Sequence, residues 1–131
     1  MTLALLTALA CTTEAGDTGA EVPLNPDSVA TSDDLYMVHL TPSSEPFVSG
    51  EDVTLGMHVL QDGEGVAGAT VEVVPWMVDM DHGTGEVVVT EMTMGDEVGM
   101  YEAAFSFSMG GYWEVTIDID GSQAVVAYEV D

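Results

Sequence analysis

The chain has no lysine and no arginine, so none of its 24 aspartate and glutamate side chains can pair with either cation. The formal net charge is −24 at pH 7 with the three histidines neutral. Proteins that bind nucleic acid neutralise phosphates with Lys or Arg, and phosphoryl transfer uses such cations to stabilise charge. The composition therefore excludes nucleic acid as a partner and arginine-dependent catalysis as a function, and it favours cations as ligands.

Charged residues make up only 18% of the chain, whereas 47% of the residues are hydrophobic. A disordered acidic tail has too few aliphatic residues to order itself. This chain has enough apolar surface to fold, and its length of 131 residues allows one domain with a small extra segment.

Cysteine is nearly absent, and the single Cys11 excludes an intrachain disulfide. It directly follows the apolar run 2–10, which is too short to span a bilayer but has the length of a signal-peptide core. Ala8-Leu9-Ala10-Cys11 resembles the lipobox of bacterial lipoproteins, in which the cysteine is lipidated and becomes the mature N-terminus. The alternative is a short buried N-terminal segment with an inert thiol.

We therefore expect residues 1–11 to be a signal peptide with a lipobox. The mature protein would begin at Cys11 and be lipid-anchored in the cell envelope, at the periplasmic face of the outer membrane. Lipidated Cys11 would be its one contact with the membrane. Residues 12–34 are rich in Thr, Asp, Glu, Ala and Pro, a composition typical of a flexible acidic linker. The folded domain is then expected over residues 35–131.

Sustained helical periodicity is also lacking, and from Leu35 onward the sequence consists of short apolar runs separated by turns. Apolar and polar residues alternate strictly over 112–119, which is the pattern of a half-buried strand. Asp120-Gly121 follows as a strong hairpin signal. Strands are predicted near 35–41, 53–61, 69–75, 86–92, 100–107, 112–119 and 123–130. This spacing predicts an all-β fold, a seven-stranded immunoglobulin-like β-sandwich.

Methionine is abundant instead, with nine residues against three phenylalanines. The densest cluster contains Met77, Met80 and His82. Met80 and His82 are two residues apart and point to the same side of an extended segment, and Met77 joins them if the chain bends after Pro75. Thioether sulfur and imidazole nitrogen form a soft, neutral donor set that selects Cu(I). The sequence therefore offers this loop as a candidate copper site.

Further residues can complete such a site. Met109 lies in a predicted turn that can fold back against the loop and supply a fourth ligand. Asp79 and Asp81 can orient the imidazole from the second coordination shell. Met92 and Met94, which are in phase with each other, are additional candidate donors.

Methionine is also a pliable core residue, and a histidine on a strand is more often solvated than a ligand. Met57 is in phase with neighbouring aliphatic residues and is assigned to the core. Met37 and His39 share one face of the first predicted strand and are assigned to the surface or an edge. His58 lies opposite the core face of its strand and is interpreted as a solvated side chain.

Residues 47–120 resemble the YtkA-like domain, a small bacterial sandwich domain similar to FixH-type and CopC-like proteins. The matching segments occur in the family's order, and one of them looks like its methionine/histidine loop: 48–51, 62–63 with 68–71, 75–83, 99–103 and 107–115. Members of the family are taken to be copper-related proteins of the cell envelope. The resemblance implies copper as the cofactor and another envelope copper protein as a partner, and we expect a monomer.

Three functions remain open. The first is a lipid-anchored envelope protein that binds or hands on copper through the Met/His loop. The second is a structural or interaction module with an acidic surface and no metal. The third is a calcium-binding domain that uses Asp118-Ile119-Asp120-Gly121 and Asp33-Asp34, although the full EF-hand pattern is absent. No nucleophile elbow, phosphate loop or His-Glu-x-x-His motif occurs, so we expect no enzymatic activity.

Overall fold

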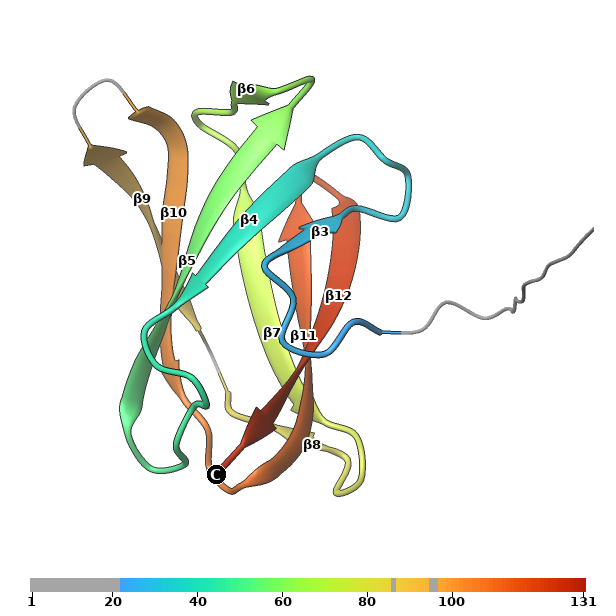
Figure 1. Cartoon of the computed structure of the whole chain (residues 1–131), viewed down its shortest axis with the longest axis vertical. Coiled ribbons are helices and arrows are strands. Elements are labelled where there is room, and N and C mark those ends of the chain that lie inside the picture. The colour runs from blue at the N-terminus through green and yellow to red at the C-terminus, as the bar shows by residue number, and fades with distance from the viewer. Residues whose placement is uncertain (1–21, 86, 95–96) are drawn as a thin grey trace, which may run out of the picture.

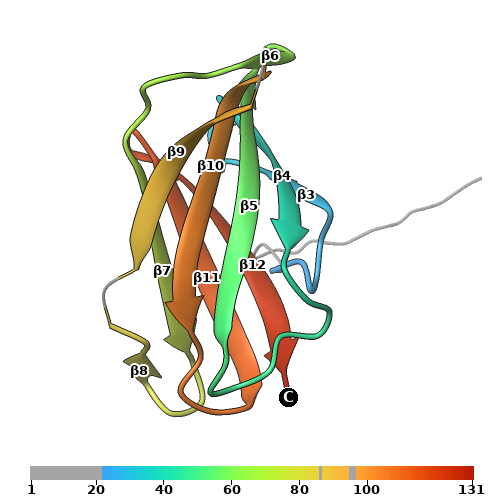
Figure 2. The same cartoon turned by 90° about the vertical axis from the view of Figure 1, so that its left-hand side faces the viewer.

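A computed structural model describes residues 22–85, 87–94 and 97–131. These residues form two packed antiparallel sheets (Figures 1 and 2). The larger sheet has the strand order β3-β4-β5-β10-β9, with β6 paired to β5, and the smaller sheet has the order β12-β11-β7-β8. The strands are β3 (Ser28–Ala30), β4 (Met37–Pro42), β5 (Asp52–Gln61), β6 (Glu64–Gly65), β7 (Val71–Met77), β8 (His82–Gly83), β9 (Val88–Met94), β10 (Glu97–Ser106), β11 (Gly111–Ile119) and β12 (Ser122–Val130).

The predicted all-β sandwich is confirmed, and each of the seven expected strands is present with bounds that shift by at most three residues. In β11 the alternation places Trp113, Val115, Ile117 and Ile119 in the core. The structure adds three strands that the pattern did not predict, β3, β6 and β8. Each has only two or three residues, too few for a periodic signal to emerge.

The start of the sandwich differs from the expected linker boundary at residue 34. Strand β3 lies inside the segment 12–34 and pairs with β4. Leu24 forms a bridge with Ala127 of β12, and Thr31 is 1% exposed. Backbone pairing fixes this segment, and composition alone does not register such pairing. Cys11, its lipobox and residues 12–21 of the expected linker lie outside the described residues.

Asp33 fastens this first segment to the far end of the chain. Its carboxylate accepts hydrogen bonds of 2.7 Å from the Ser122 hydroxyl and 2.8 Å from the Thr31 hydroxyl. These bonds hold the pKa of Asp33 below its ordinary value. The bonds therefore support the fold above the ordinary pKa of an aspartate, and this support is lost as the pH falls through the lowered pKa.

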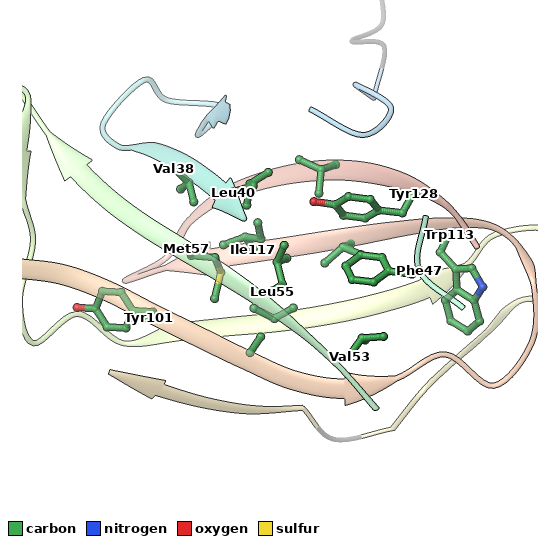
Figure 3. Close-up of a cluster of buried hydrophobic side chains, with 14 of the residues drawn as sticks. Val38, Leu40, Phe47, Val53, Leu55, Met57, Tyr101, Trp113, Ile117 and Tyr128 are labelled. Atoms are coloured by element: carbon green, nitrogen blue, oxygen red, sulfur yellow. The ribbon is translucent and has the colours of Figure 1, made fainter. Parts of the chain in front are cut away.

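The core lies between the two sheets, with most of its aromatic residues gathered at one end (Figure 3). Phe107 packs against Trp113 with ring centroids 5.0 Å apart, and Phe47 packs edge-on against Tyr128 at 5.1 Å. Met57 is fully buried, as the sequence predicts. The aromatic end of this core supports the site described below.

Two buried tyrosines differ in how their hydroxyls are satisfied. Tyr101 donates to the Val66 carbonyl at 2.8 Å and accepts the Ala69 N–H at 3.0 Å. The hydroxyl of Tyr128 is buried and has no hydrogen-bond partner among the described residues. Burial raises the pKa of both phenols. Above pH of about 10 an unfolded tyrosine ionises while these two stay protonated in the fold, so their raised pKa lowers the stability in alkali.

We expect Tyr128→Phe to raise the free energy of unfolding by about 1 kcal/mol at pH 7, because it removes an unsatisfied buried hydroxyl. The variant should also lose less stability than the wild type between pH 9 and pH 11, because one raised pKa is gone. Tyr101→Phe is the matched control and should cost about 1–2 kcal/mol, since it leaves a carbonyl and an N–H unpaired. Urea titrations at pH 7 and across the alkaline range measure both. Equal effects of the two substitutions would contradict the assignment of the hydroxyls.

Candidate metal centre

A tight turn brings the methionine-rich loop back onto its own strand. Strand β7 ends at Met77, whose carbonyl accepts the N–H groups of Met80 at 3.3 Å and of Asp81 at 2.8 Å. Asp81 has a left-handed backbone with φ of 55°, a conformation that Asp tolerates better than most residues. The turn reverses the chain so that β8 pairs with β7 and His82 lies opposite Met77.

The imidazole of His82 meets a thioether from a distant part of the chain. Its Nε2 lies 3.3 Å from the sulfur of Met109, which belongs to the loop between β10 and β11. Its Nδ1 lies 3.3 Å from the carbonyl oxygen of Gly83. Figure 2 shows both connections, β7–β8 and β10–β11, at the lower end of the sandwich. Two of the donor residues expected from the sequence are thus in direct contact.

Trp113 packs against both partners of the contact between His82 and Met109. Its ring is fully buried and meets the His82 ring edge-on, with centroids 5.8 Å apart. The indole N–H donates a 2.9 Å hydrogen bond to the carbonyl of Met109. The same side chain therefore packs against the imidazole and holds the loop that carries the sulfur.

Met77 occupies the inner side of the site. It is 6% exposed and packs in the core, so it serves the packing role that methionine has in many cores. Its terminal methyl lies against Gly111, where an added Cβ would be 2.6 Å away. Gly111 also has φ of 131°, which other residues rarely adopt. Glycine at this position leaves room for the end of the Met77 side chain.

Met80 and the two acidic residues of the turn lie at the surface. Met80 is 55% exposed, and Asp79 and Asp81 are exposed. Among the described residues no hydrogen bond joins either carboxylate to His82, so the expected orientation of the imidazole by Asp79 or Asp81 stays a prediction. The Gly83 carbonyl faces Nδ1 in their place. A backbone carbonyl is a common outer-shell partner of a metal-binding histidine.

The donor geometry suits a single ion. With bonds of about 2.0 Å to nitrogen and about 2.3 Å to sulfur, two ligand atoms about 3.3 Å apart subtend an angle of about 100° at a metal. The separation of His82 Nε2 and Met109 Sδ has this value. The part of the chain that the structure describes has no group of three or more His, Cys, Asp or Glu side chains placed to share an ion. Thioether sulfur is not among those donors.

The acidic turn expected as a calcium alternative uses its carboxylates locally. Asp118 accepts the N–H of Gly121 at 2.9 Å, and Asp120 accepts the N–H of Thr70 at 2.9 Å. Asp33 is bound by the hydroxyls of Ser122 and Thr31. These carboxylates close the β11–β12 hairpin and fasten it to its neighbours, which is an ordinary role for acids at a turn.

The sequence predicts no role in the site for Trp113 or Gly111. The sequence does carry one signal for Trp113. Met109, a candidate donor, lies only four residues before this aromatic residue, at the start of the predicted strand 112–119.

Met92, the additional candidate donor, lies on β9 in the larger sheet, away from the β7–β8 turn.

Comparisons with known proteins give a family and a fold. A family model described as YtkA-like matches residues 31–118, more than half of the chain. Among solved structures, the crystal structure of the Lin-41 filamin domain has a TM-score of 0.52 at 11% identity, covering 70% of this chain and 91% of that one. The ZirS C-terminal domain has a TM-score of 0.48 at 13% identity, covering 95% of this chain and 87% of its own. The search of curated proteins gives no match. The described residues include no helix of the length and apolarity that a membrane crossing requires.

Proposed function

The chain belongs to the YtkA-like family, and we propose that it binds copper, with Cu(I) preferred, at the end of the sandwich where His82 meets Met109. The observation that carries the proposal is the 3.3 Å contact between the imidazole nitrogen and the thioether sulfur. Imidazole and thioether together are the donors that soft copper selects. Zinc is disfavoured because structural zinc sites use thiolates.

The remaining ligands follow from their positions. Met77 lies opposite His82 in the β7–β8 pair and packs at the inner side of the site. Met80 is 55% exposed in the turn above it and can approach an ion from the solvent side. All four donors are neutral. The net charge of −24 on the chain favours the approach of a cation to them.

The exposure of the donors supports a role in holding or passing on the ion, without turnover. Met109 is 39% exposed and Met80 is 55% exposed, so an ion at this site can exchange its ligands with those of a second protein. We place this activity in the cell envelope, with the protein anchored through lipidated Cys11, and another envelope copper protein as its partner. The lipobox resemblance of residues 8–11 supports the location.

The test is an anaerobic Cu(I) titration of the full chain against a chromophoric chelator. We expect His82→Ala and Met109→Leu each to weaken Cu(I) binding at least about tenfold, equivalent to about 1.4 kcal/mol or more. Met57→Leu is the matched control, because this methionine is fully buried in the core and the substitution nearly conserves volume. It should leave the affinity unchanged. Equal affinities of wild type, His82→Ala and Met109→Leu would reject the site.

A metal-free interaction module is the second candidate. It is favoured by the outward face of β7 and the turn that follows, where Val74, Trp76 and Val78 are 52%, 41% and 46% exposed. The melting temperature separates the two functions. A ligand at one hundred times its Kd stabilises the folded state by about 2.7 kcal/mol, whereas under this alternative added Cu(I) leaves the melting temperature unchanged.

A further inference from the structure

A row of soft donors crosses the outer face of the larger sheet. His39 of β4 pairs directly with His58 of β5, His58 pairs with Met100 of β10, and Met100 pairs with Met92 of β9. Residues directly opposite each other on neighbouring antiparallel strands point to the same face, with Cβ atoms about 4.5–5.5 Å apart. The four side chains therefore share one face.

This face points to solvent. The sequence neighbours Val38 and Met57 are fully buried and point into the core (Figure 3). His39 is exposed, and His58 is partly exposed. Figure 1 shows β4 and β5 side by side in the larger sheet, whereas β8, which carries His82, lies at the lower end of the smaller sheet. The row is separate from the His82 site.

The two imidazoles lie close to the span of a chelating pair. Their ring centroids are 6.4 Å apart, with the planes tilted by 47°. With bonds of about 2.0 Å from nitrogen to metal, two imidazoles on one ion have centroids about 4.4 Å apart at a right angle and about 6.3 Å apart when opposed. A small rotation of the rings toward each other brings them into this range.

The ring nitrogens are largely available. Nε2 of His58 lies 3.1 Å from the carbonyl of Val98. Within the described residues, no hydrogen bond is formed by Nδ1 of His58 or by either nitrogen of His39. A backbone carbonyl on one ring nitrogen fixes the orientation of an imidazole and leaves the other nitrogen to bind a metal.

We propose that His39 and His58 form a second copper site, which takes Cu(II). Imidazole suits divalent copper, and copper exceeds the other divalent first-row metals in affinity for a given nitrogen site. The thioether of Met100, next in the row, is not required for this chelate. This proposal uses none of the residues of the His82 site and goes beyond the Cu(I) function proposed above.

The test is a Cu(II) titration of the full chain, without reductant, in a glycine buffer that competes with weak carboxylate and α-amine sites. Electron paramagnetic resonance should show nitrogen hyperfine coupling from two imidazoles. We expect His39→Gln and His58→Gln each to weaken this binding at least tenfold. The double variant should be little worse than either single one, because a chelate is lost with its first ligand.

Two controls separate the histidine pair from the His82 site and from the rest of the row. His82→Ala removes the third histidine and should leave the Cu(II) signal unchanged. A failure of the Cu(II) proposal is therefore distinguishable from a failure of the proposed Cu(I) site. Met100→Leu alters the next residue of the row and should also leave the Cu(II) affinity unchanged. Binding that survives both His39→Gln and His58→Gln would overturn the proposal. So would a loss caused by His82→Ala, or a loss by Met100→Leu as large as that of the histidine variants.

Discussion

Replacing Gly99 with alanine should lower the free energy of unfolding by about 3 kcal/mol or more, or prevent folding. Gly99 has φ of 90°, in the left-handed region that disfavours a side chain. An added Cβ would lie 2.6 Å from the carbonyl oxygen of Val59 and 2.6 Å from the nitrogen of Val66. These two backbone atoms form a 3.0 Å hydrogen bond with each other. Strain and overlap each cost about 1–3 kcal/mol, and backbone cannot move aside as a flexible side chain can.

Gly63→Ala is the matched control for this prediction. Gly63 has φ of 82°, but an added Cβ there meets nothing within 4 Å. It should cost only the backbone strain, about 1–2 kcal/mol. Urea unfolding of the three proteins gives both values. A Gly99→Ala variant as stable as Gly63→Ala would show that the overlap at the corner of β5, β6 and β10 is relieved at little cost.

Raising the NaCl concentration from about 10 mM to about 150 mM should stabilise the fold by at least about 1 kcal/mol, or about 5 °C in melting temperature. The chain has 24 carboxylates and no Lys or Arg to pair with them. Over this range the Debye length falls from about 30 Å to about 8 Å, so the repulsion between distant carboxylates is progressively screened. Thermal melts at constant pH measure the effect, and a melting temperature independent of salt would contradict it.

A single cross-strand pair gives this prediction a local test. Glu72 and Asp118 lie directly opposite each other on β7 and β11, and like charges in this position are destabilising. Glu72→Lys should stabilise the protein at low salt and reduce its salt dependence. Glu72→Gln removes the charge without reversing it and should give a smaller change in the same direction. The two variants share the site and differ chiefly in charge.

The long strands were predictable because their side chains alternate with a period of two, as in the run 112–119 that became β11. Strands β3 and β8 were not predictable from the sequence, because a strand of two or three residues shows no period. The pairing of these strands is fixed by backbone hydrogen bonds. The short strand β8 matters most for the site, since it is what places His82 opposite Met77. A periodicity argument alone suggests a bend after Pro75 but not this pairing.

The candidate ligands were predictable by chemistry and less so by position. The soft-donor composition singled out His82 and Met109, and the structure brings them into contact. The orienting role expected for Asp79 and Asp81 stays a prediction, and the contact that the structure shows at Nδ1 of the imidazole is the Gly83 carbonyl. The pairing of His39 with His58 depends on which strands become neighbours. That is a property of the topology, which the residue pattern of a single strand does not contain.

The indole of Trp113 has a consequence for how the protein can be observed. Its N–H is bonded to the loop that carries Met109 and its ring makes a T-shaped contact with His82, whereas Trp76, the other tryptophan, is 41% exposed. Light emission from a buried indole depends on its immediate polar contacts, so an event that displaces this loop should change the emission of Trp113. Trp113 is thus an intrinsic fluorescent probe at the boundary between the core and the loops.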